Sequence, residues 1–233
     1  MQMQLNADFT ERALVHTLQT DWVASPMSGV NRRMLDRVGD EVARATSVVR
    51  FEPGSMFPMH AHGGGEEIFV LEGTFSDEHG NFGPGHYFRN PPGTSHTPFT
   101  HEGCTIFVKL WQFQDGDSVS VSTNTRATAF SPGMVEGLSV LPLHQFKTES
   151  AALVRWQPGT CFNPHTHFGG EEIFVIEGTF QDEFGSYPAG SWIRSPHQSV
   201  HTPFSDEGCL IYVKVGHLLK EHGTLSDPAQ RPA

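Results

Sequence analysis

Two short segments of the chain carry histidine and glutamate at the same spacing. The first, HAHGGGEEIFVLEG, occupies residues 60–73, and the second, HTHFGGEEIFVIEG, occupies residues 165–178. Eleven of the fourteen positions are identical. Imidazole and carboxylate groups are donors that proteins offer to zinc, iron, nickel, manganese and cobalt. Each segment therefore has the side chains for one divalent metal site.

A strand, a bend and a returning strand would bring the donors of each segment together. In a β-strand residues i and i+2 point to the same face, so the two histidines of each segment project together. The Gly-Gly pair that follows lets the chain bend sharply and carry the next glutamate back toward them. A third histidine follows a proline-containing turn, 34 residues after the second. The predicted ligand sets are His60, His62, Glu66 and His96 in the first copy and His165, His167, Glu171 and His201 in the second.

Each segment has two adjacent glutamates, and strand parity favours the first. Glu66 shares its face with the apolar Ile68 and Val70. Glu67 would point to the other face, which is also apolar, so this strand is expected to be buried on both sides. The other domain, or a second chain in a homodimer, would cover that outer face. Glu67 and Glu172 remain the alternative carboxylates.

The two segments belong to a longer internal repeat. A constant offset of 105 residues runs from His60 and His165 to Cys104 and Cys209, without insertion or deletion. This is a duplication, and its period suits two whole domains rather than a solenoid. The predicted division is residues 1–125, residues 126–220 and a loose polar tail at residues 221–233.

Both copies are predicted to be all-β. Short runs of β-branched and aromatic residues alternate with Gly- and Pro-rich turns, and no ten-residue stretch of either copy has a convincing helical period. A sandwich or barrel per copy is therefore expected. Near the N-terminus, RALVHTL at residues 12–18 is compatible with a strand or a helical turn, and a strand is favoured.

Composition narrows the classes of function. The 233 residues carry a formal net charge of −11, which disfavours binding to nucleic acid or anionic membranes. No run of 18 apolar residues suggests a membrane span. Three cysteines make no disulfide framework, and the N-terminus lacks the pattern of a signal peptide. We expect a cytoplasmic protein with reduced thiols.

The repeated segments resemble the first motif of the cupin superfamily. That motif is a glycine, five residues, HxH, three or four residues, a glutamate, six residues and a glycine. Residues 54–73 fit it throughout, and so do residues 159–178. The resemblance implies two tandem jelly-roll β-barrels with a metal ion in each, and therefore two divalent ions per chain.

The second cupin motif, with glycine, proline, glycine, histidine and asparagine at fixed spacing, is less complete. Residues 85–96 match it through the histidine. The second copy has Gln198 where the motif has glycine, and both copies lack the final asparagine, with Thr100 and Ser205 in its place. The turn before His201 is therefore the expected departure.

A narrower resemblance is to the cupin-like domain of ChrR anti-sigma factors, through HxHxGGEE, FSDEHG, RNPPG and EGCTIFVKL. It implies a zinc-binding sensory or regulatory module that takes a small molecule or oxidant and has a protein partner in a stress response. Those proteins carry the sigma-binding function in an N-terminal helical domain with its own His/Cys zinc site, and this sequence shows neither a CxxC motif nor a helical stretch of that length. The alternative function is an Fe(II)-dependent dioxygenase that cleaves a small organic substrate. Zinc is the expected metal, with iron, nickel or manganese as alternatives.

Overall fold

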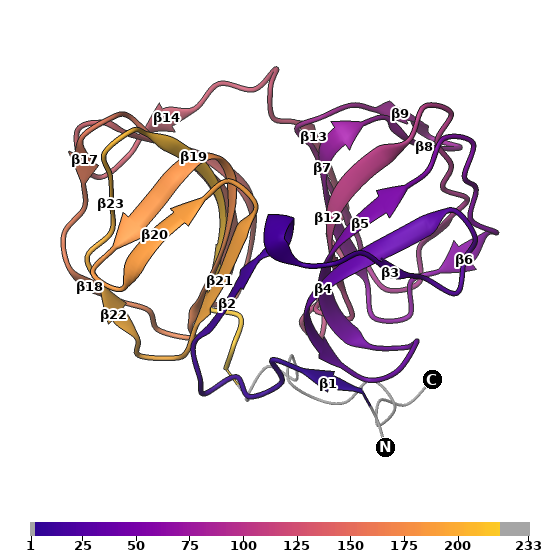
Figure 1. Ribbon diagram of the computed structural model, residues 1–233, viewed down its shortest axis with the longest axis horizontal. Helices are drawn as coiled ribbons and strands as arrows, with labels where there is room; N and C mark the ends of the chain where they lie inside the picture. Colours follow the sequence, from indigo (N-terminus) through magenta and orange to yellow (C-terminus); the bar gives the residue numbers. More distant parts are fainter. Residues whose placement is uncertain (1–2, 220–233) are drawn as a thin grey trace. The chain divides into compact units, whose positions relative to one another are not determined.

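The computed structural model describes residues 3–219, which divide into two compact units (Figure 1). Unit 1 comprises residues 3–7 and 21–127, and unit 2 comprises residues 8–20 and 128–219. Helix in the described residues is limited to the 3-10 turn η1 (Thr17–Gln19), so no helix there could span a membrane. The prediction of an all-β chain is confirmed.

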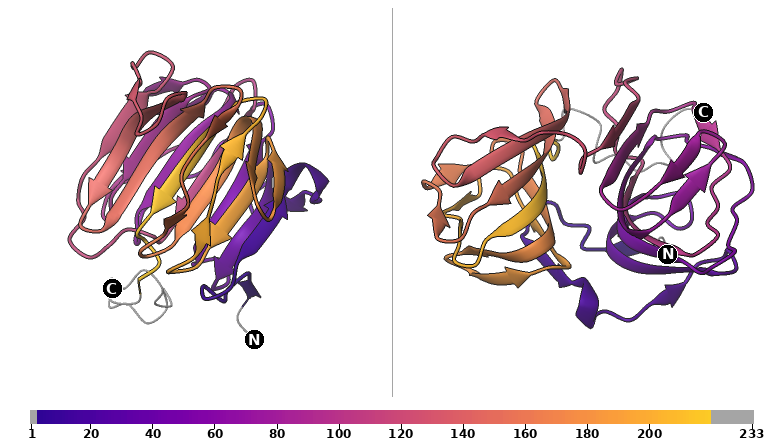
Figure 2. Two further views of the ribbon diagram at one scale, coloured as in Figure 1. Left: turned by 90° about the vertical axis from the view of Figure 1, so that its left-hand side faces the viewer. Right: turned by 90° about the horizontal axis from the view of Figure 1, so that it is seen from above.

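In unit 1 most of the strands form one antiparallel sheet that curls around an interior (Figure 2). Its order is β1 (Gln4–Leu5), β4 (Val30–Val38), β5 (Arg44–Phe51), β12 (Cys104–Leu110), β7 (Glu66–Gly73), β10 (His86–Asn90) and β13 (Val121–Asn124), with β3 (Val23–Ala24) paired to β4. Two short ladders complete the unit: β6 (His60–Ala61) with β11 (Ser95–His96), and β8 (Phe75–Asp77) with β9 (Gly80–Phe82).

Unit 2 repeats this arrangement. Its sheet runs β14 (Ser131–Pro132), β15 (Leu138–Phe146), β16 (Glu149–Trp156), β24 (Cys209–Val215), β19 (Glu171–Asp182), β21 (Ser191–Ser195) and β2 (Ala13–His16). The strands β17 (Thr160–Cys161), β20 (Gly185–Pro188) and β23 (Phe204–Ser205) extend it, and β18 (His165–Thr166) pairs with β22 (Val200–His201).

The last strand of unit 2 comes from the start of the chain. β2 pairs antiparallel with β21, with Ala13 opposite Arg194. In unit 1 the equivalent edge is filled by β13, which pairs with β10 and places Val121 opposite Arg89. The predicted strand at residues 12–18 is thus present as β2, and η1 follows it directly.

Each unit has its own apolar interior. In unit 1 the cluster contains Val30, Val49, Phe51, Ile68, Val70, Phe75, Phe88, Cys104, Ile106 and Val108. In unit 2 it contains Trp156, Ile173, Val175, Phe180, Tyr187, Ile193, Cys209 and Ile211. Ile68 and Val70 therefore face the interior, as strand parity predicted, while Glu67 and Phe69 on the opposite face are buried as well.

Candidate metal centres

The three histidines of unit 1 are positioned by the short ladder of β6 and β11. His60 lies directly opposite His96. The ladder continues through backbone bonds from His62 N to Thr94 O at 2.9 Å and from Gly93 N to His62 O at 3.0 Å. The HxH spacing and the turn before His96 thus place all three imidazoles on one hairpin-like ladder.

The glycines after HxH allow the chain to turn back into the sheet. Gly65 has φ +76°, and a Cβ there would lie 2.3 Å from the ring of Phe113. In unit 2, Gly170 has φ +75°, and a Cβ would lie 2.5 Å from Leu218. Both positions combine left-handed backbone with close packing, which only glycine accommodates. The next residue in each case is the first glutamate of the long strand, Glu66 or Glu171.

The four predicted donors of unit 1 converge. One ligand atom from each of His60, His62, Glu66 and His96 lies within 4.8 Å of every other. Oε2 of Glu66 is 3.3 Å from Nε2 of His62 and 3.4 Å from Nε2 of His96. The rings of His62 and His96 meet edge to face, with centroids 4.6 Å apart.

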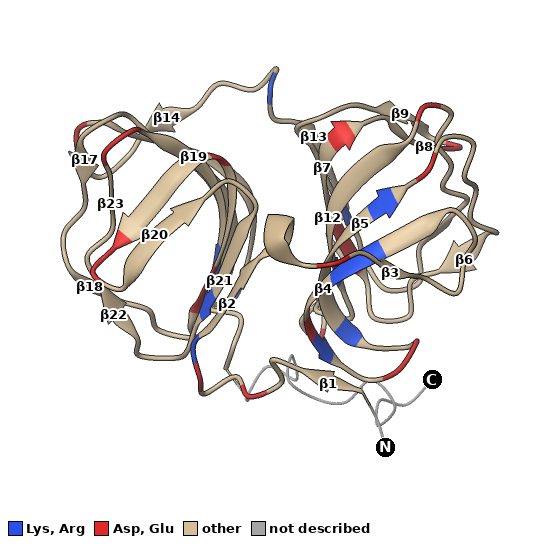
Figure 3. Cartoon of the chain, viewed as in Figure 1, with Lys and Arg blue, Asp and Glu red and all other residues tan. Residues whose placement is uncertain are grey.

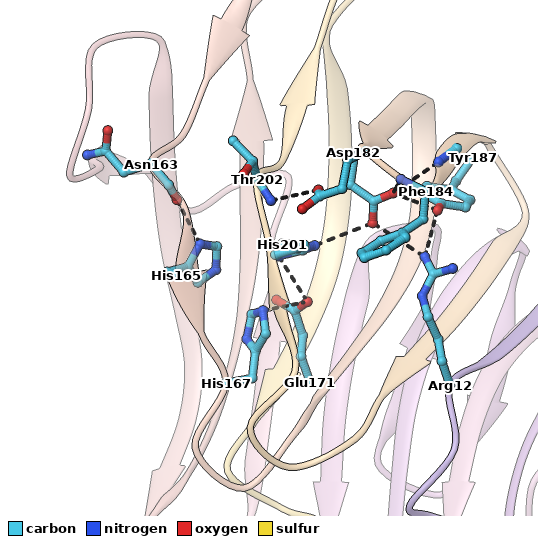
Figure 4. Close-up of polar contacts among 12 residues, drawn as sticks. Arg12, Asn163, His165, His167, Glu171, Asp182, Phe184, Tyr187, His201 and Thr202 are labelled. Carbon is cyan, nitrogen blue, oxygen red and sulfur yellow. Dashed lines mark hydrogen bonds and ion pairs between the residues drawn. The ribbon is translucent and has the colours of Figure 1, made fainter.

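Unit 2 reproduces this geometry (Figure 4). One ligand atom from each of its four predicted donors also lies within 4.8 Å of the others. Oε2 of Glu171 is 3.4 Å from Nε2 of His167 and 3.5 Å from Nε2 of His201. His165 lies opposite His201 in the ladder of β18 and β22, and its ring centroid is 4.9 Å from that of His201.

The outer ring nitrogens of unit 1 are held by hydrogen-bond partners, which leaves the inner ones free to bind a ligand. Nδ1 of His60 is 3.1 Å from Pro58 O, and Nδ1 of His62 is 2.9 Å from Thr94 Oγ1. Nδ1 of His96 is 3.2 Å from Oδ2 of Asp77. Partners of this kind fix the ring orientation of metal-binding histidines.

The inner nitrogens of four histidines form no hydrogen bond to any described residue, although each lies within 3.5 Å of a glutamate oxygen. Nε2 is buried and forms no hydrogen bond within the described residues in four histidines: His62, His96, His167 and His201. A buried donor or acceptor without a partner is costly, so these atoms require something to bind. Two donors about 2.1 Å from one ion at tetrahedral angles are about 3.4 Å apart. The observed separations of 3.3–3.5 Å match that value, so both sets fit a divalent cation.

Burial shifts the pKa values of His62 and Glu66 in directions that favour binding of a cation. It lowers the pKa of His62 to about 4, with help from the neighbouring His96 and His60. It raises the pKa of Glu66 to about 7, although a hydrogen bond from Asn90 opposes this. Neutral imidazoles are the form that binds metal, and a cation would stabilise the buried carboxylate.

The protonation of unit 2 follows the same pattern. Burial, with the charges of His201 and His165, lowers the pKa of His167 to about 3. Burial also raises the pKa of Glu171 to about 7. The two copies thus agree in the electrostatics of their donors as well as in geometry.

Unit 2 has an additional support that begins on the N-terminal segment (Figure 4). Nδ1 of His201 is 3.4 Å from Oδ2 of Asp182, and that same oxygen is 3.3 Å from Nη2 of Arg12. The Tyr187 hydroxyl donates to Oδ1 of Asp182 at 2.7 Å. Burial alone would raise the pKa of Asp182, but the hydrogen bonds from His201 and Tyr187 and the charge of Arg12 lower it. Among the described residues of unit 1, the equivalent Asp77 contacts His96 but forms no ion pair with an Arg or a Lys.

The departure at Gln198 does not alter the turn. Gln198 adopts φ +65°, close to the +88° of Gly93 in unit 1. Its backbone N donates to His167 O at 2.9 Å, as Gly93 N donates to His62 O at 3.0 Å. The left-handed conformation costs about 1–2 kcal/mol at a residue with a side chain. His201 is therefore positioned as His96 is in unit 1, at the expense of local strain at Gln198.

The second glutamates face away from the donors. Glu67 accepts a hydrogen bond from the Tyr87 hydroxyl at 2.8 Å and lies 3.8 Å from Nε of Arg89. Glu172 accepts from Nε1 of Trp192 at 2.8 Å. Both carboxylates are buried in outer-face networks of their own unit, and neither belongs to a convergent set.

Three supporting residues were not predicted. Asp77 and Asp182 stand at the same 105-residue offset as the histidines, in SDEHG and QDEFG, so the repeat itself held a signal for them. Arg12 had no such signal, because its contact with Asp182 spans 170 positions of sequence.

Each unit also contains a cavity beside its donors. In unit 1 the cavity is about 330 Å³ and is lined by His60, Glu66 and His96 together with mostly apolar side chains. In unit 2 it is about 170 Å³ and is bordered by His165, Glu171 and His201. The larger cavity lies within the size range of small-molecule sites.

Comparison with protein families gives a match over most of the chain. The ChrR cupin-like domain matches residues 10–114 and again residues 118–219. The chain belongs to the ChrR cupin-like family. It is a bicupin, with two jelly-roll domains, and carries two potential metal sites of histidine and glutamate. Comparison with curated proteins gave no match.

Solved structures share the bicupin fold at low sequence identity. A protein of Nostoc punctiforme, provisionally named a dioxygenase, has a TM-score of 0.71 at 14% identity over 99% of this chain and 87% of its own. Protein YlbA of E. coli has a TM-score of 0.68 at 16% identity over 89% and 92%. A single-residue variant of oxalate decarboxylase from Bacillus subtilis has a TM-score of 0.56 at 16% identity over 88% and 77%. At these identities the likeness concerns the fold.

Proposed function

We propose that this bicupin is a metal-dependent regulatory module that binds a small molecule at a metal centre. The supporting observation is the convergence on one carboxylate, in each unit, of buried Nε2 atoms that form no hydrogen bond within the described residues. The proposed ligands are His60, His62, Glu66 and His96 for the first ion and His165, His167, Glu171 and His201 for the second. The bound ion would act as a Lewis acid toward a ligand that reaches it.

Zinc is the metal we propose first. Three imidazoles and one carboxylate suit a borderline ion, and separations of 3.3–3.5 Å between Glu and His donors suit tetrahedral coordination. Iron, nickel and manganese accept the same donors at higher coordination number. The protein's own contribution is to hold the rings in one orientation, through partners such as Thr94 and Asp77.

The regulatory role rests on the family to which the chain belongs. The family is named after ChrR. In this proposal a small-molecule or oxidant ligand would change the metal centre, and that change would alter binding to a protein partner in a stress response. The net charge of −11 favours protein or small-molecule partners over nucleic acid, and we place the protein in the cytoplasm.

A second candidate function, an Fe(II)-dependent dioxygenase, is favoured by the cavity of unit 1. A volume of about 330 Å³ directly beside His60, Glu66 and His96 would admit a small organic substrate and O₂. The fold neighbour named as a dioxygenase is consistent with this candidate. Ordered apolar walls would exclude bulk water from such a reaction.

Metal analysis of protein purified without added metal tests the proposal. We expect two equivalents of zinc per chain and one equivalent in the double variant His60→Ala/His62→Ala. The control is His79→Ala, which removes an exposed histidine outside both sets. Two equivalents of iron together with O₂ uptake would support the dioxygenase instead. No bound metal after reconstitution with zinc, iron, nickel or manganese would refute both.

A further inference from the structure

One charged side chain enters the cavity of unit 1 from β4. Val30 belongs to the apolar cluster, and Arg32, two residues further along the strand, lies on the same face. Arg32 is opposite Val49, another member of the cluster, and lines the cavity together with the metal-set residues. Figure 3 shows basic residues on β4, of which Arg32 is the one that lines this cavity.

The guanidinium of Arg32 is incompletely satisfied. Its Nη1 is 3.3 Å from Oε2 of Glu41, and its Nε is buried without a hydrogen-bond partner among the described residues. The Arg32 side chain is 18% exposed, whereas that of Glu41 is 65% exposed. An exposed carboxylate in such a pair contributes little and is easily replaced. In the described part of the chain Nε of Arg32 thus lacks an acceptor, and the acceptor of Nη1, the Glu41 carboxylate, can be replaced by a ligand.

Unit 2 has no counterpart of this cation. The strand register places Arg32 opposite Val49 in unit 1 and Val140 opposite Val154 in unit 2. Val49 and Val154 are equivalent positions of the repeat, so Val140 occupies the place of Arg32. Within described unit 2, the residues around the cavity include no Arg or Lys. The two donor sets are nearly identical, but an arginine lines the cavity of unit 1 and none is among the described residues that line the cavity of unit 2.

We propose that Arg32 anchors the carboxylate of a small organic acid whose apolar body fills the cavity of unit 1. A carboxylate matches the planar guanidinium with two hydrogen bonds and would take the place of Glu41. The apolar side chains that line the same cavity, including Val49, Phe57, Phe75 and Val108, call for an apolar body. The proposal rests on the proposed function, since it makes unit 1 the ligand-binding cupin and leaves unit 2 without an anion anchor.

Paired probes that differ only in charge test the assignment. Binding of hexanoate and benzoate is compared with binding of hexanamide and benzamide by calorimetry, in zinc-loaded and in chelator-treated full-length protein. We expect both acids to bind more tightly than their amides. In Arg32→Met this preference should fall on the order of 10- to 100-fold, as for a lost charge-assisted pair. Glu41→Gln should strengthen acid binding, because it removes the competing carboxylate.

The control is Arg33→Met, whose guanidinium lies 4.1 Å from the centroid of the Trp22 ring and does not line the cavity. It should keep the preference for acids. Unchanged preference in Arg32→Met, or no binding of either acid to the wild type at about 10 mM, would overturn the proposal. A misfolded variant would lose affinity for the acids, so tighter acid binding by Glu41→Gln cannot arise from misfolding. A preference that depends on Arg32 in the chelator-treated protein would stand even if neither donor set bound metal, so the two proposals can fail separately.

Discussion

Replacing Glu66 with glutamine should affect the metal-free and metal-bound protein in opposite directions. Glu66 is 7% exposed, and burial raises the pKa of its carboxyl group from 4.5 to about 7. Without a cation, the ionised group opposes folding, and with one it is the sole anionic donor of its set. Glu66→Gln should therefore stabilise the metal-free protein at neutral and higher pH and weaken metal binding.

The size of the stability effect follows from that pKa. A rise from 4.5 to about 7 corresponds to about 3 kcal/mol once the carboxyl is fully ionised. Because the pKa of Glu66 is higher in the folded state, the folded protein binds more protons than the unfolded protein does at the same pH. Stability from this group is then full below about pH 4.5 and is lost as pH rises to about 7. The gain in Glu66→Gln should be near zero at pH 4 and approach about 3 kcal/mol at pH 8.

The assay compares Glu66→Gln with Glu67→Gln, the adjacent and chemically identical change. Both are made in a His165→Ala/His167→Ala background, so that one donor set remains. Denaturant unfolding with chelator gives the free energy at each pH, and metal titration gives the affinity. We expect Glu66→Gln to lose at least about 10–100-fold in affinity, whereas Glu67→Gln keeps the affinity and weakens the charge contact with Arg89 on the outer face.

The opposite result would refute this reasoning. If Glu67→Gln lost the metal and Glu66→Gln kept it, the strand register would be wrong by one residue, and the inner and outer faces of β7 would be exchanged. If Glu66→Gln lost affinity but gained no stability at pH 8, the carboxylate would be a ligand without the burial penalty described above.

Three further outcomes are expected. Arg12→Met should weaken metal binding several-fold in unit 2 and leave unit 1 unchanged, which titration of each half-site variant would measure; equal loss in both units would contradict the support through Asp182. Gln198→Gly should stabilise the protein by up to about 1 kcal/mol in denaturant unfolding, by relieving the left-handed strain; a destabilised variant would mean that the glutamine side chain has a compensating contact. Chelation of metal should lower the midpoint of thermal unfolding at pH 8 more than at pH 5, since the uncompensated carboxylates are ionised only at the higher pH; a pH-independent shift would contradict the raised pKa values of Glu66 and Glu171.

Much of the fold and the donor sets could be predicted because the duplication fixes them locally. HxH, the glycine bend and the first glutamate lie within seven residues of one another, and strand parity chooses between Glu66 and Glu67. The turn at Gln198 could not be judged from sequence, because a left-handed backbone is unfavourable but accessible to glutamine. Arg32 lies on a strand whose two copies do not align at the constant offset, so its difference from Val140 became visible only from the pairing of β4 with β5 and of β15 with β16.

The origin of β2 has a consequence for the order of events during synthesis. Residues 8–20 are synthesised before most of unit 1, whereas their partner strand β21 (Ser191–Ser195) is synthesised after it. The segment therefore stays unpaired while the strands of unit 1 emerge and pair with one another. Until β2 arrives, β21 presents an open sheet edge, which is a template for pairing with the same strand of another chain. A bulky fusion or proteolytic nick at the N-terminus would therefore harm the C-terminal cupin first, and strand-exchanged dimers are the form of misassembly to look for.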